Sequence, residues 1–218
     1  KRQDPHLHRL KASSFKWHEI SKKSADEKLP LLGRENPMIS SATNGNEGQI
    51  NDDPIDFVHT GPATAAGKYM RLFWHPVHVA RDLKPAYPVP LKIMSEDFTL
   101  YRGESGKPYA VGFRCAHRGT QLSTGWVEGE CIRCFYHGWK YDGTGQCVEQ
   151  PAESVPFASK VKIRSYPTEE YLGLIFVYLG EGTAPPLPRY PELEVEGVLE
   201  ANSYVRHCNY FNSLDNGI

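Results

Sequence analysis

The sequence predicts a mostly β, antiparallel fold, and two observations lead to this prediction. First, 218 residues with 39% apolar and 11% aromatic side chains can build a hydrophobic core, which excludes wholesale disorder. Second, short runs of β-branched, aromatic and leucine residues alternate with glycine-containing turns from residue 91 onward, as is typical of antiparallel strands. The runs that we interpret as strands are residues 91–94, 99–101, 109–113, 161–163 and 172–179.

Charge balance and hydropathy exclude several classes of protein. The chain has 25 Lys and Arg against 26 Asp and Glu, a formal net charge of -1, so it lacks the basic field of a nucleic-acid-binding protein. The longest apolar stretch, Tyr171 to Leu179, is about half of the roughly 20 residues that span a bilayer, and no signal peptide opens the chain. Five cysteines are too sparse, and odd in number, for a disulfide scaffold. We therefore expect a cytoplasmic protein with no membrane or nucleic-acid partner.

The N-terminal part divides into two segments. Residues 1–37 are polar and hold nine Lys and Arg against five Asp and Glu. We expect a non-native or disordered leader there, with native translation starting at Met38, and a genuine disordered basic tail is the alternative. An N-terminal arm and helix follow over residues 38–72. The helix-start signal at residues 60–62 and the apolar spacing after it predict a helix that Pro76 terminates.

Three further segments complete the chain. The β domain is expected over residues 73–183, and a proline-rich connector over residues 184–200. Residues 201–218 are expected to begin a second, truncated domain. Within it, Ala201 to Phe211 is predicted to open a second sheet as its first strand.

Two Cys and His pairs stand out within the β domain. Cys115 and His117 are separated by one residue, and Cys134 and His137 by two. In an extended segment, residues i and i+2 point to one face, so each pair can reach two metal ions that lie side by side. Two cysteines on one iron and two histidines on the other are the ligand set of a Rieske [2Fe-2S] cluster.

The residues that follow each pair suit such a site. Gly119 and Gly138 permit backbone angles closed to other residues and leave room for amides to approach the bridging sulfurs. Such hydrogen bonds raise the reduction potential, and so does the replacement of two thiolates by neutral imidazoles. Each histidine would keep an outward ring N–H, which can couple electron gain to proton gain or bind a partner carboxylate.

Two other interpretations compete for these residues. Cys131 and Cys134 form a CxxC motif, which with Cys115 and His117 could make a zinc site of the Cys3His type. In the other, all of these residues are structural, with cysteines as small buried hydrophobes and histidines satisfied in the core. For Cys131, Cys147 and Cys208 taken singly, we favour this structural interpretation.

Residues 115–119 and 134–139 resemble the two cluster loops of the large (alpha) subunit of Rieske non-haem iron aromatic-ring-hydroxylating oxygenases. By this resemblance Arg118, Gly119, Gly138 and Trp139 belong to the cofactor-binding loops. Rieske proteins of the respiratory complexes carry an extra cysteine in each loop, and residues 118–120 and 135–136 have none. Residues 59–62 and 71–77 are similar to the entry segment of phthalate-dioxygenase-like members.

The resemblance also implies a function. A reductase or ferredoxin would supply electrons to the [2Fe-2S] cluster, which would pass them to a mononuclear Fe(II) for O2-dependent hydroxylation of an aromatic substrate. In this family the transfer crosses between neighbouring subunits, so a homotrimer, alone or stacked, is expected. A stand-alone Rieske-type electron-transfer protein is the alternative. It should end near Gly180, whereas this chain continues to Ile218.

The last residues resemble the run of the α+β oxygenase catalytic domain that precedes the mononuclear iron ligands. By this resemblance, residues 201–218 are the truncated start of that catalytic domain. The position three residues after Asp215 is Ile218 rather than histidine, so we assign no mononuclear iron ligand, and no catalytic residue, within this chain. Asn209, Asp215 and Asn216 are candidates for supporting positions near that iron, or for residues that cap or start the helix carrying its ligands.

Overall fold

The computed structural model describes residues 56–215, so the predictions for the leader over residues 1–37 and for Met38 lie outside the described residues. The described part contains three antiparallel sheets, with strand orders β1-β11-β10, β2-β3-β4-β9 and β5-β6-β7-β8. The predicted mostly β, antiparallel fold is confirmed. None of the helices in the described part is both long enough and apolar enough to cross a bilayer.

The strands are β1 (Trp74–Val79), β2 (Val89–Ile93), β3 (Glu96–Arg102), β4 (Pro108–Gly112), β5 (Trp126–Glu128), β6 (Cys131–Arg133), β7 (Lys140–Tyr141), β8 (Cys147–Glu149), β9 (Ser165–Tyr166), β10 (Thr168–Tyr171) and β11 (Leu174–Tyr178). The α-helices are α2 (Ala65–Met70) and α3 (Tyr210–Asp215). Single 3-10 turns span η1 (Ala80–Asp82), η2 (Leu122–Thr124), η3 (Ala158–Lys160) and η4 (Pro191–Leu193).

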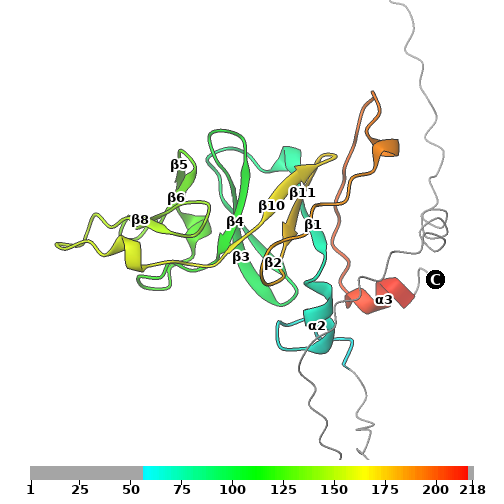
Figure 1. Ribbon diagram of the computed structural model, residues 1–218, viewed down its shortest axis with the longest axis horizontal. Helices are drawn as coiled ribbons and strands as arrows, with labels where there is room; N and C mark the ends of the chain where they lie inside the picture. Colours follow the sequence, from blue (N-terminus) through cyan, green and yellow to red (C-terminus); the bar gives the residue numbers. More distant parts are fainter. Residues whose placement is uncertain (1–55, 216–218) are drawn as a thin grey trace, which may run out of the picture. The chain divides into compact units, whose positions relative to one another are not determined.

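Strands β3 and β4 separate two hydrophobic cores, and Figure 1 shows them between the strands of the other two sheets. Successive side chains of a strand point to opposite faces. Tyr101 and Val111 therefore face one core, while Leu100 and Ala110 face the other. All four side chains are almost fully buried. The core that contains Tyr101 also holds the cysteines of both predicted cluster loops.

Helix α2 is shorter than the sequence predicts and begins later. Thr64 is its N-cap, and the Thr64 hydroxyl accepts a hydrogen bond from Gly67 N at 3.0 Å, so the start predicted near Pro62 is wrong by a few residues. The predicted end at Pro76 is also wrong, since the helix ends at Met70. Pro76 lies in β1, an edge strand, beside a register shift where a missing N–H is tolerated.

Two of the predicted strands lie at other residues than predicted, and a third predicted strand does not form. The run at residues 161–163 contains no named strand; Lys162 forms an isolated bridge with Gln146, and β9 follows at Ser165. The run at residues 172–179 contains the Leu172-Gly173 turn and then β11. The strand predicted within Ala201–Phe211 is wrong, because residues 201–209 have no strand partner among the described residues and α3 begins at Tyr210.

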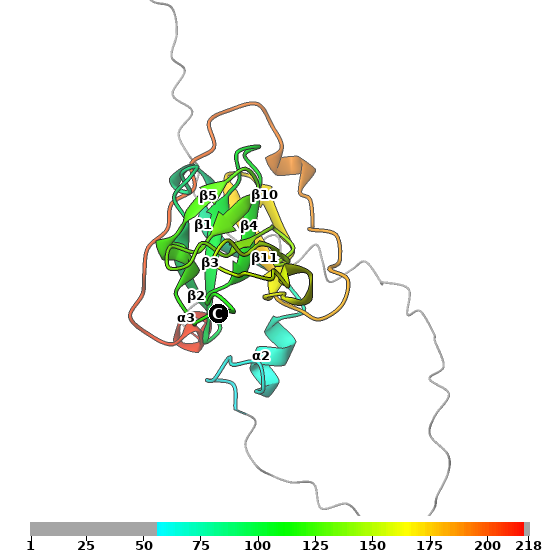
Figure 2. The ribbon, with the colours of Figure 1, turned by 90° about the vertical axis from the view of Figure 1, so that its left-hand side faces the viewer.

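The proline-rich segment after β11 packs against the β1-β11-β10 sheet and its turns. Pro185 O accepts a hydrogen bond from Trp74 Nε1 at 2.8 Å, and Tyr190 N donates to the Tyr171 hydroxyl at 2.7 Å. Leu187 in this segment is buried, with 6% of its surface exposed. Figure 2 shows the segment running round the outside of the strands. The predicted connector is therefore an ordered strap rather than a free linker.

Candidate metal centre

The two predicted cluster loops have the same backbone geometry. In the first loop, Cys115 N donates to Thr120 O at 2.8 Å and Gly119 N donates to Cys115 O at 2.9 Å. In the second, Cys134 N donates to Trp139 O at 2.8 Å and Gly138 N donates to Cys134 O at 3.1 Å. Each loop is thus closed by two hydrogen bonds over the same spacing, although the histidine is one position later in the second.

A glycine in the left-handed region completes each loop. The φ angle is +70° at Gly119 and +74° at Gly138, a conformation that other residues adopt only with strain. This confirms the predicted conformational role of both glycines. The first loop follows β4, and the second connects β6 to β7, so the two sheets together bring the loops face to face.

The four predicted ligands divide into a buried pair and a more exposed pair. Cys115 and Cys134 are each 2% exposed. The rings of His117 and His137 are in edge contact, with centroids 4.7 Å apart and an interplanar angle of 63°. Two adjacent thiols inside the core and two adjacent imidazoles toward the surface fit a cluster with one thiolate-bound and one imidazole-bound iron.

The structure does not favour the zinc alternative. Among residues 56–215, no group of three or more His, Cys, Asp and Glu side chains is placed to hold a single metal ion. A tetrahedral zinc needs three or four protein ligands, whereas a Rieske cluster takes only two side chains on each iron because sulfide completes the coordination. The donor set therefore fits the cluster better than it fits zinc.

The hydroxyl of the buried Tyr141 side chain contacts the first loop. Its oxygen lies 3.2 Å from Cys115 Sγ and accepts a hydrogen bond from Ala116 N at 3.1 Å. Since the amide is the donor in that second contact, the Tyr141 proton is free to point at the sulfur. Burial raises the pKa of Tyr141 well above its usual range, so the hydroxyl stays a donor. Burial also raises the pKa of the Cys115 thiol, and the Tyr141 hydrogen bond opposes that rise.

Trp139, a predicted cofactor-loop residue, forms one wall of the site. Its indole is 3% exposed and stacks on the His117 ring, with centroids 4.7 Å apart and an interplanar angle of 6°. Phe157 packs edge-on against the Trp139 indole, with ring centroids 5.6 Å apart. Trp139 Nε1 is buried and has no hydrogen-bond partner among the described residues.

An ion-pair network centred on Arg133 supports the second loop. Arg133 directly precedes Cys134, and its Nη1 donates to Gly138 O at 2.7 Å. Arg133 Nη2 also donates to Glu128 Oε2 at 2.7 Å and to Glu149 Oε2 at 2.8 Å. Lys140 Nζ joins Glu149 at 2.7 Å. The guanidinium fork thus ties both ends of the loop to strands β5 and β8.

The carboxylates of this network have strongly lowered pKa values. Hydrogen bonds from Arg133 and then Trp126 lower the pKa of Glu128 to about 2. Hydrogen bonds from Arg133 and Lys140 lower the pKa of Glu149 to about 2. Both groups are therefore ionised throughout the neutral range.

The two histidines have different neighbours. His117 Nε2 lies 4.0 Å from Glu153 Oε1, and the His117 side chain is 22% exposed. A cavity of about 500 Å³ opens beside it, lined by Trp139, Glu153 and Phe157 among others. The ring of His137 instead contacts Tyr136, with centroids 3.8 Å apart. Sequence reasoning missed Glu153, Arg133 and Tyr141, because only the fold brings them to the loops.

The remaining predicted residues lie away from the ligands. Arg118 is exposed and forms no hydrogen bond or ion pair with another described residue. Asn209 caps α3, with its Oδ1 accepting a hydrogen bond from Phe211 N at 2.9 Å, which agrees with the capping role considered above. Asp215 is the last residue of α3, and Asn216 lies outside the described residues.

The structural interpretation of the other cysteines is confirmed only in part. Cys147 is buried in the same core as the cluster-loop cysteines, and Cys131 in β6 is half-buried. Cys208 is exposed, so its predicted burial is wrong. It lies in the segment between β11 and α3, outside both hydrophobic cores.

With this geometry established, residues 73–167 match the Rieske [2Fe-2S] domain family. This part of the chain is a Rieske domain, and the chain is a relative of the oxygenase subunits of Rieske oxygenases. It is 33% identical over 164 residues to a 5,5'-dehydrodivanillate O-demethylase oxygenase subunit of Sphingobium sp., covering 72% of this chain and 39% of that protein. It is 41% identical over 134 residues to a phenoxybenzoate dioxygenase subunit alpha of Ectopseudomonas oleovorans, covering 60% and 32%.

The solved structures give a consistent result. A crystal structure of dicamba monooxygenase with non-heme iron and dicamba matches with a TM-score of 0.53 and 27% identity, covering 58% of this chain and 39% of that one. The chain therefore spans between about a third and two fifths of the length of these relatives.

Proposed function

We propose that this chain belongs to the terminal oxygenase component of a Rieske-type oxygenase. Within it, Cys115 and Cys134 would bind one iron and His117 and His137 the other. The observation that carries the proposal is the pair of equivalent loops, each closed by the same two hydrogen bonds, that places two buried thiols beside two part-exposed imidazoles. When bound, the cluster supplies one-electron transfer at a higher potential than an all-cysteine centre.

The protein's own groups would control the electrostatics of that site. Burial of the two thiols excludes water from the sulfur end. The Tyr141 hydroxyl, 3.2 Å from Cys115 Sγ, would donate to the sulfur and spread the negative charge of a bound thiolate. The Trp139 indole fixes the plane of the His117 imidazole by stacking against it. The Arg133 guanidinium donates to the backbone of the second loop at Gly138 O and pairs with the carboxylates of Glu128 and Glu149.

The rest of the proposed function follows from the relatives. They are named as oxygenases and demethylases that act on aromatic and other compounds, which supports an O2-dependent reaction with an aromatic substrate. We propose that a reductase or ferredoxin supplies the electrons and that a mononuclear iron outside these residues carries out the chemistry. A homotrimer and a cytoplasmic location complete the proposal.

The alternative is a stand-alone Rieske-type electron carrier. The strap over residues 184–200, which follows the Rieske domain and hydrogen-bonds to Trp74 and Tyr171, favours the oxygenase instead. The names of the relatives also favour the oxygenase.

One spectrum tests the cluster. The purified chain reduced under anaerobic conditions should give an EPR signal of low average g-value, typical of a histidine-ligated [2Fe-2S] centre. His117→Cys and His137→Ala should abolish that signal while circular dichroism keeps its β signature. A colourless protein with one equivalent of zinc, or an unchanged signal in either variant, would refute the ligand assignment.

A further inference from the structure

Two buried N–H donors beside the cluster loops have no acceptor in the protein. Trp139 Nε1 and Gln150 Nε2 are shielded from solvent and form no hydrogen bond with any residue in the described part of the chain. Both residues are only 3% exposed. A buried donor without an acceptor loses its hydration without compensation, so most buried polar groups in proteins are paired. The two donors therefore point to an acceptor that the polypeptide does not supply.

Other side chains of the same two types use their donors within the protein. The indole N–H groups of Trp74 and Trp126 donate to oxygen acceptors at 2.8 Å and 2.7 Å. The side-chain amide of Gln146 donates to three main-chain carbonyls, the nearest at 2.8 Å. The missing acceptors are therefore a property of the place where Trp139 and Gln150 lie, and not of their residue types.

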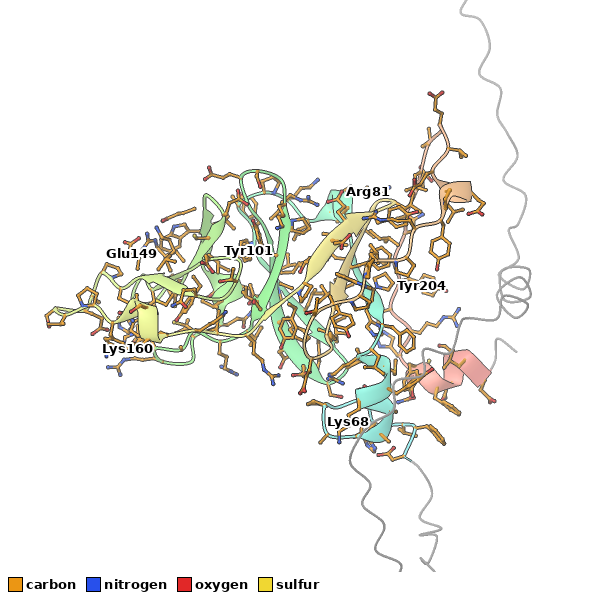
Figure 3. The ribbon with its side chains drawn as sticks, in the orientation of Figure 1. Lys68, Arg81, Tyr101, Glu149, Lys160 and Tyr204 are labelled. Carbon is orange, nitrogen blue, oxygen red and sulfur yellow. The ribbon has the colours of Figure 1, made fainter. Side chains whose placement is uncertain are left out.

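The two donors come from neighbouring positions at the ends of adjacent strands. Lys140 of β7 pairs with Glu149 of β8 in antiparallel register, and Trp139 and Gln150 are the next residues beyond this pair. Lys140 and Glu149 form an ion pair at 2.7 Å, and Figure 3 shows Glu149 at the edge of the part that carries β5 to β8. Because successive side chains of a strand alternate in direction, Trp139 and Gln150 both turn inward.

Phe157 contacts both residues and fixes the orientation of the Gln150 amide. Its ring packs against the Trp139 indole, with centroids 5.6 Å apart, and its N donates to Gln150 Oε1 at 2.7 Å. Exchanging the oxygen and nitrogen of the Gln150 amide would lose this hydrogen bond. The amide oxygen is therefore satisfied, and only the NH2 group of Gln150 lacks a partner.

Trp139 and Gln150 also lie against the two cluster loops. The Trp139 indole stacks on His117 of the first loop, with centroids 4.7 Å apart. Pro151, directly after Gln150, lies so close to the second loop that a Cβ at Gly138 would be 2.9 Å from Pro151 Cγ. The unpaired donors are thus held by residues that border both ligand loops.

A [2Fe-2S] cluster bound between these loops brings the kind of acceptor that is missing. It carries two bridging sulfides, and the thiolates of Cys115 and Cys134 add two more sulfur atoms. Both cysteines lie in the same hydrophobic core as Trp139. Sulfur atoms of such clusters accept hydrogen bonds from N–H groups, so the two donors fit the group that the loops are proposed to hold.

We propose that Trp139 Nε1 and Gln150 Nε2 donate hydrogen bonds to sulfur atoms of the bound [2Fe-2S] cluster. The inference rests on the proposed function, because it takes the two loops as the cluster-binding loops. Such hydrogen bonds favour the reduced, more negatively charged cluster, so both side chains raise its reduction potential. A buried water molecule is the competing acceptor, and the experiments below distinguish it from sulfur.

Pulsed EPR on the reduced full chain tests the Trp139 bond directly. The chain is prepared with tryptophan labelled with ¹⁵N in the indole ring. A hydrogen bond to sulfur transfers unpaired spin to the donor nitrogen, so the HYSCORE spectrum should show an isotropic ¹⁵N coupling. This coupling should vanish in Trp139→Phe and persist in the control Trp126→Phe, whose indole donates to Glu128. No isotropic coupling, or the same coupling in Trp139→Phe, would overturn the bond from Trp139.

The same measurement with glutamine labelled with ¹⁵N in the side-chain amide tests Gln150. An isotropic coupling should be present in the wild type, vanish in Gln150→Met and persist in Gln146→Met, because the Gln146 amide already donates to main-chain carbonyls. If water is the acceptor, the wild type gives no isotropic coupling from this label, and the bond from Gln150 is refuted. The labelled wild type gives this answer even if Gln150→Met fails to fold.

The reduction potential is a second readout that a merely structural role would not move. At a fixed electrode potential, the ratio of reduced to oxidised cluster should fall about fivefold in Trp139→Phe and in Gln150→Met, as expected for one lost hydrogen bond. The ratio should change less than about twofold in Gln146→Met. Circular dichroism and iron content confirm that each variant is folded and loaded. Ratios within about twofold of the wild type in both test variants would overturn the proposal.

The two proposals fail in different ways. If the reduced chain gives the EPR signal of a histidine-ligated cluster but no isotropic coupling to either label, the hydrogen bonds to sulfur are wrong and the proposed function stands. If the EPR signal itself is absent, the proposed function is wrong and this inference falls with it.

Discussion

The His117 imidazole lies parallel to the Trp139 indole, 6° from coplanar orientation, with the ring centroids 4.7 Å apart. The two residues come from different loops, so the stack joins the first cluster loop to the second. Trp139 also closes the second loop through its carbonyl, which accepts from Cys134 N. One residue thus links the orientation of the His117 imidazole, through its side chain, to the backbone around Cys134, through its carbonyl.

Replacing Trp139 should therefore disrupt both loops. Trp139→Ala is expected to lower the free energy of unfolding by about 3 to 5 kcal/mol, because it removes a large buried ring. Trp139→Phe should keep most of the stability, since it retains a ring that can stack. Thermal unfolding and iron content per chain measure both effects. Tyr87→Ala, which removes a ring at a 72% exposed position between η1 and β2, is the control, and an equal loss of iron there would contradict a specific role for Trp139.

Tyr141→Phe tests the hydrogen bond to the cysteine sulfur. The variant removes only the oxygen that lies 3.2 Å from Cys115 Sγ. A hydrogen bond to a charged group contributes on the order of 1 kcal/mol or more, so the cluster's reduction potential should fall by roughly 40 mV or more for one electron. Protein-film voltammetry measures the shift.

Tyr101→Phe is the matched control for this prediction. Tyr101 is fully buried in the same core, and its hydroxyl donates to Glu130 O at 3.0 Å instead of to a cluster ligand. The reduction potential of the cluster in Tyr101→Phe should stay close to that of the wild type. Equal potentials in the Tyr141 variant and the wild type would exclude a hydrogen bond from Tyr141 to the ligand sulfur.

The two loops that carry the proposed ligands could be predicted from the sequence because their information is local. The spacing of Cys115 and His117, and of Cys134 and His137, together with a glycine after each pair, marks the loops without knowledge of the fold. The structure then brings together residues with no local signal. Glu153 lies sixteen positions after His137 in the chain yet sits beside His117, because the chain returns past the first loop before η3.

Other residues were missed or misplaced for physical reasons. Arg133 lies inside a CxxC motif, whose cysteines predict a metal site. The sequence has no local pattern that predicts hydrogen bonds from the five N–H donors of its guanidinium. Ala201 to Phe211 has the apolar content of a strand, but a strand needs a hydrogen-bonding partner, and none is present among residues 56–215. Composition alone cannot supply that partner.

The two loop glycines should respond differently to the same substitution. Gly119→Ala places a Cβ in open space at φ +70°, so its cost is the backbone strain alone, roughly 1 to 2 kcal/mol. Gly138→Ala adds a Cβ only 2.9 Å from Pro151 Cγ at φ +74°, so the proline must also move. Gly138→Ala is therefore expected to lower the thermal midpoint and the iron content more than Gly119→Ala.

Gly106→Ala is the control for backbone strain at a glycine outside the two cluster loops. Gly106 has φ +89° with open space around it, in the turn between β3 and β4. The Gly106→Ala variant should lower the thermal midpoint about as much as Gly119→Ala does but leave the iron content unchanged. A larger effect at Gly119 than at Gly138 would contradict the steric argument.

The ion-pair network around Arg133 should make stability fall in acid. The pKa values of Glu128 and Glu149 are lowered from 4.5 to about 2 in the folded chain, so the folded state binds these protons less tightly than the unfolded state does. Their contribution to stability is fully present above about pH 4.5 and is lost as the pH falls toward about 2. Both side chains are substantially exposed, at 38% and 41%, so solvent screening reduces the effect.

Urea unfolding midpoints measured across this pH window test the network. Glu128→Gln/Glu149→Gln should lower the midpoint at neutral pH and flatten its decline between about pH 4.5 and about pH 2, because the two titrating carboxylates are gone. The loss at neutral pH follows because Arg133, whose side chain is only 13% exposed, keeps its charge without either partner. Glu192→Gln/Glu196→Gln makes the same change in charge at exposed positions and should leave both the midpoint and its pH dependence close to those of the wild type. Parallel acid profiles in the two double variants would show that the network does not contribute to the loss of stability in acid.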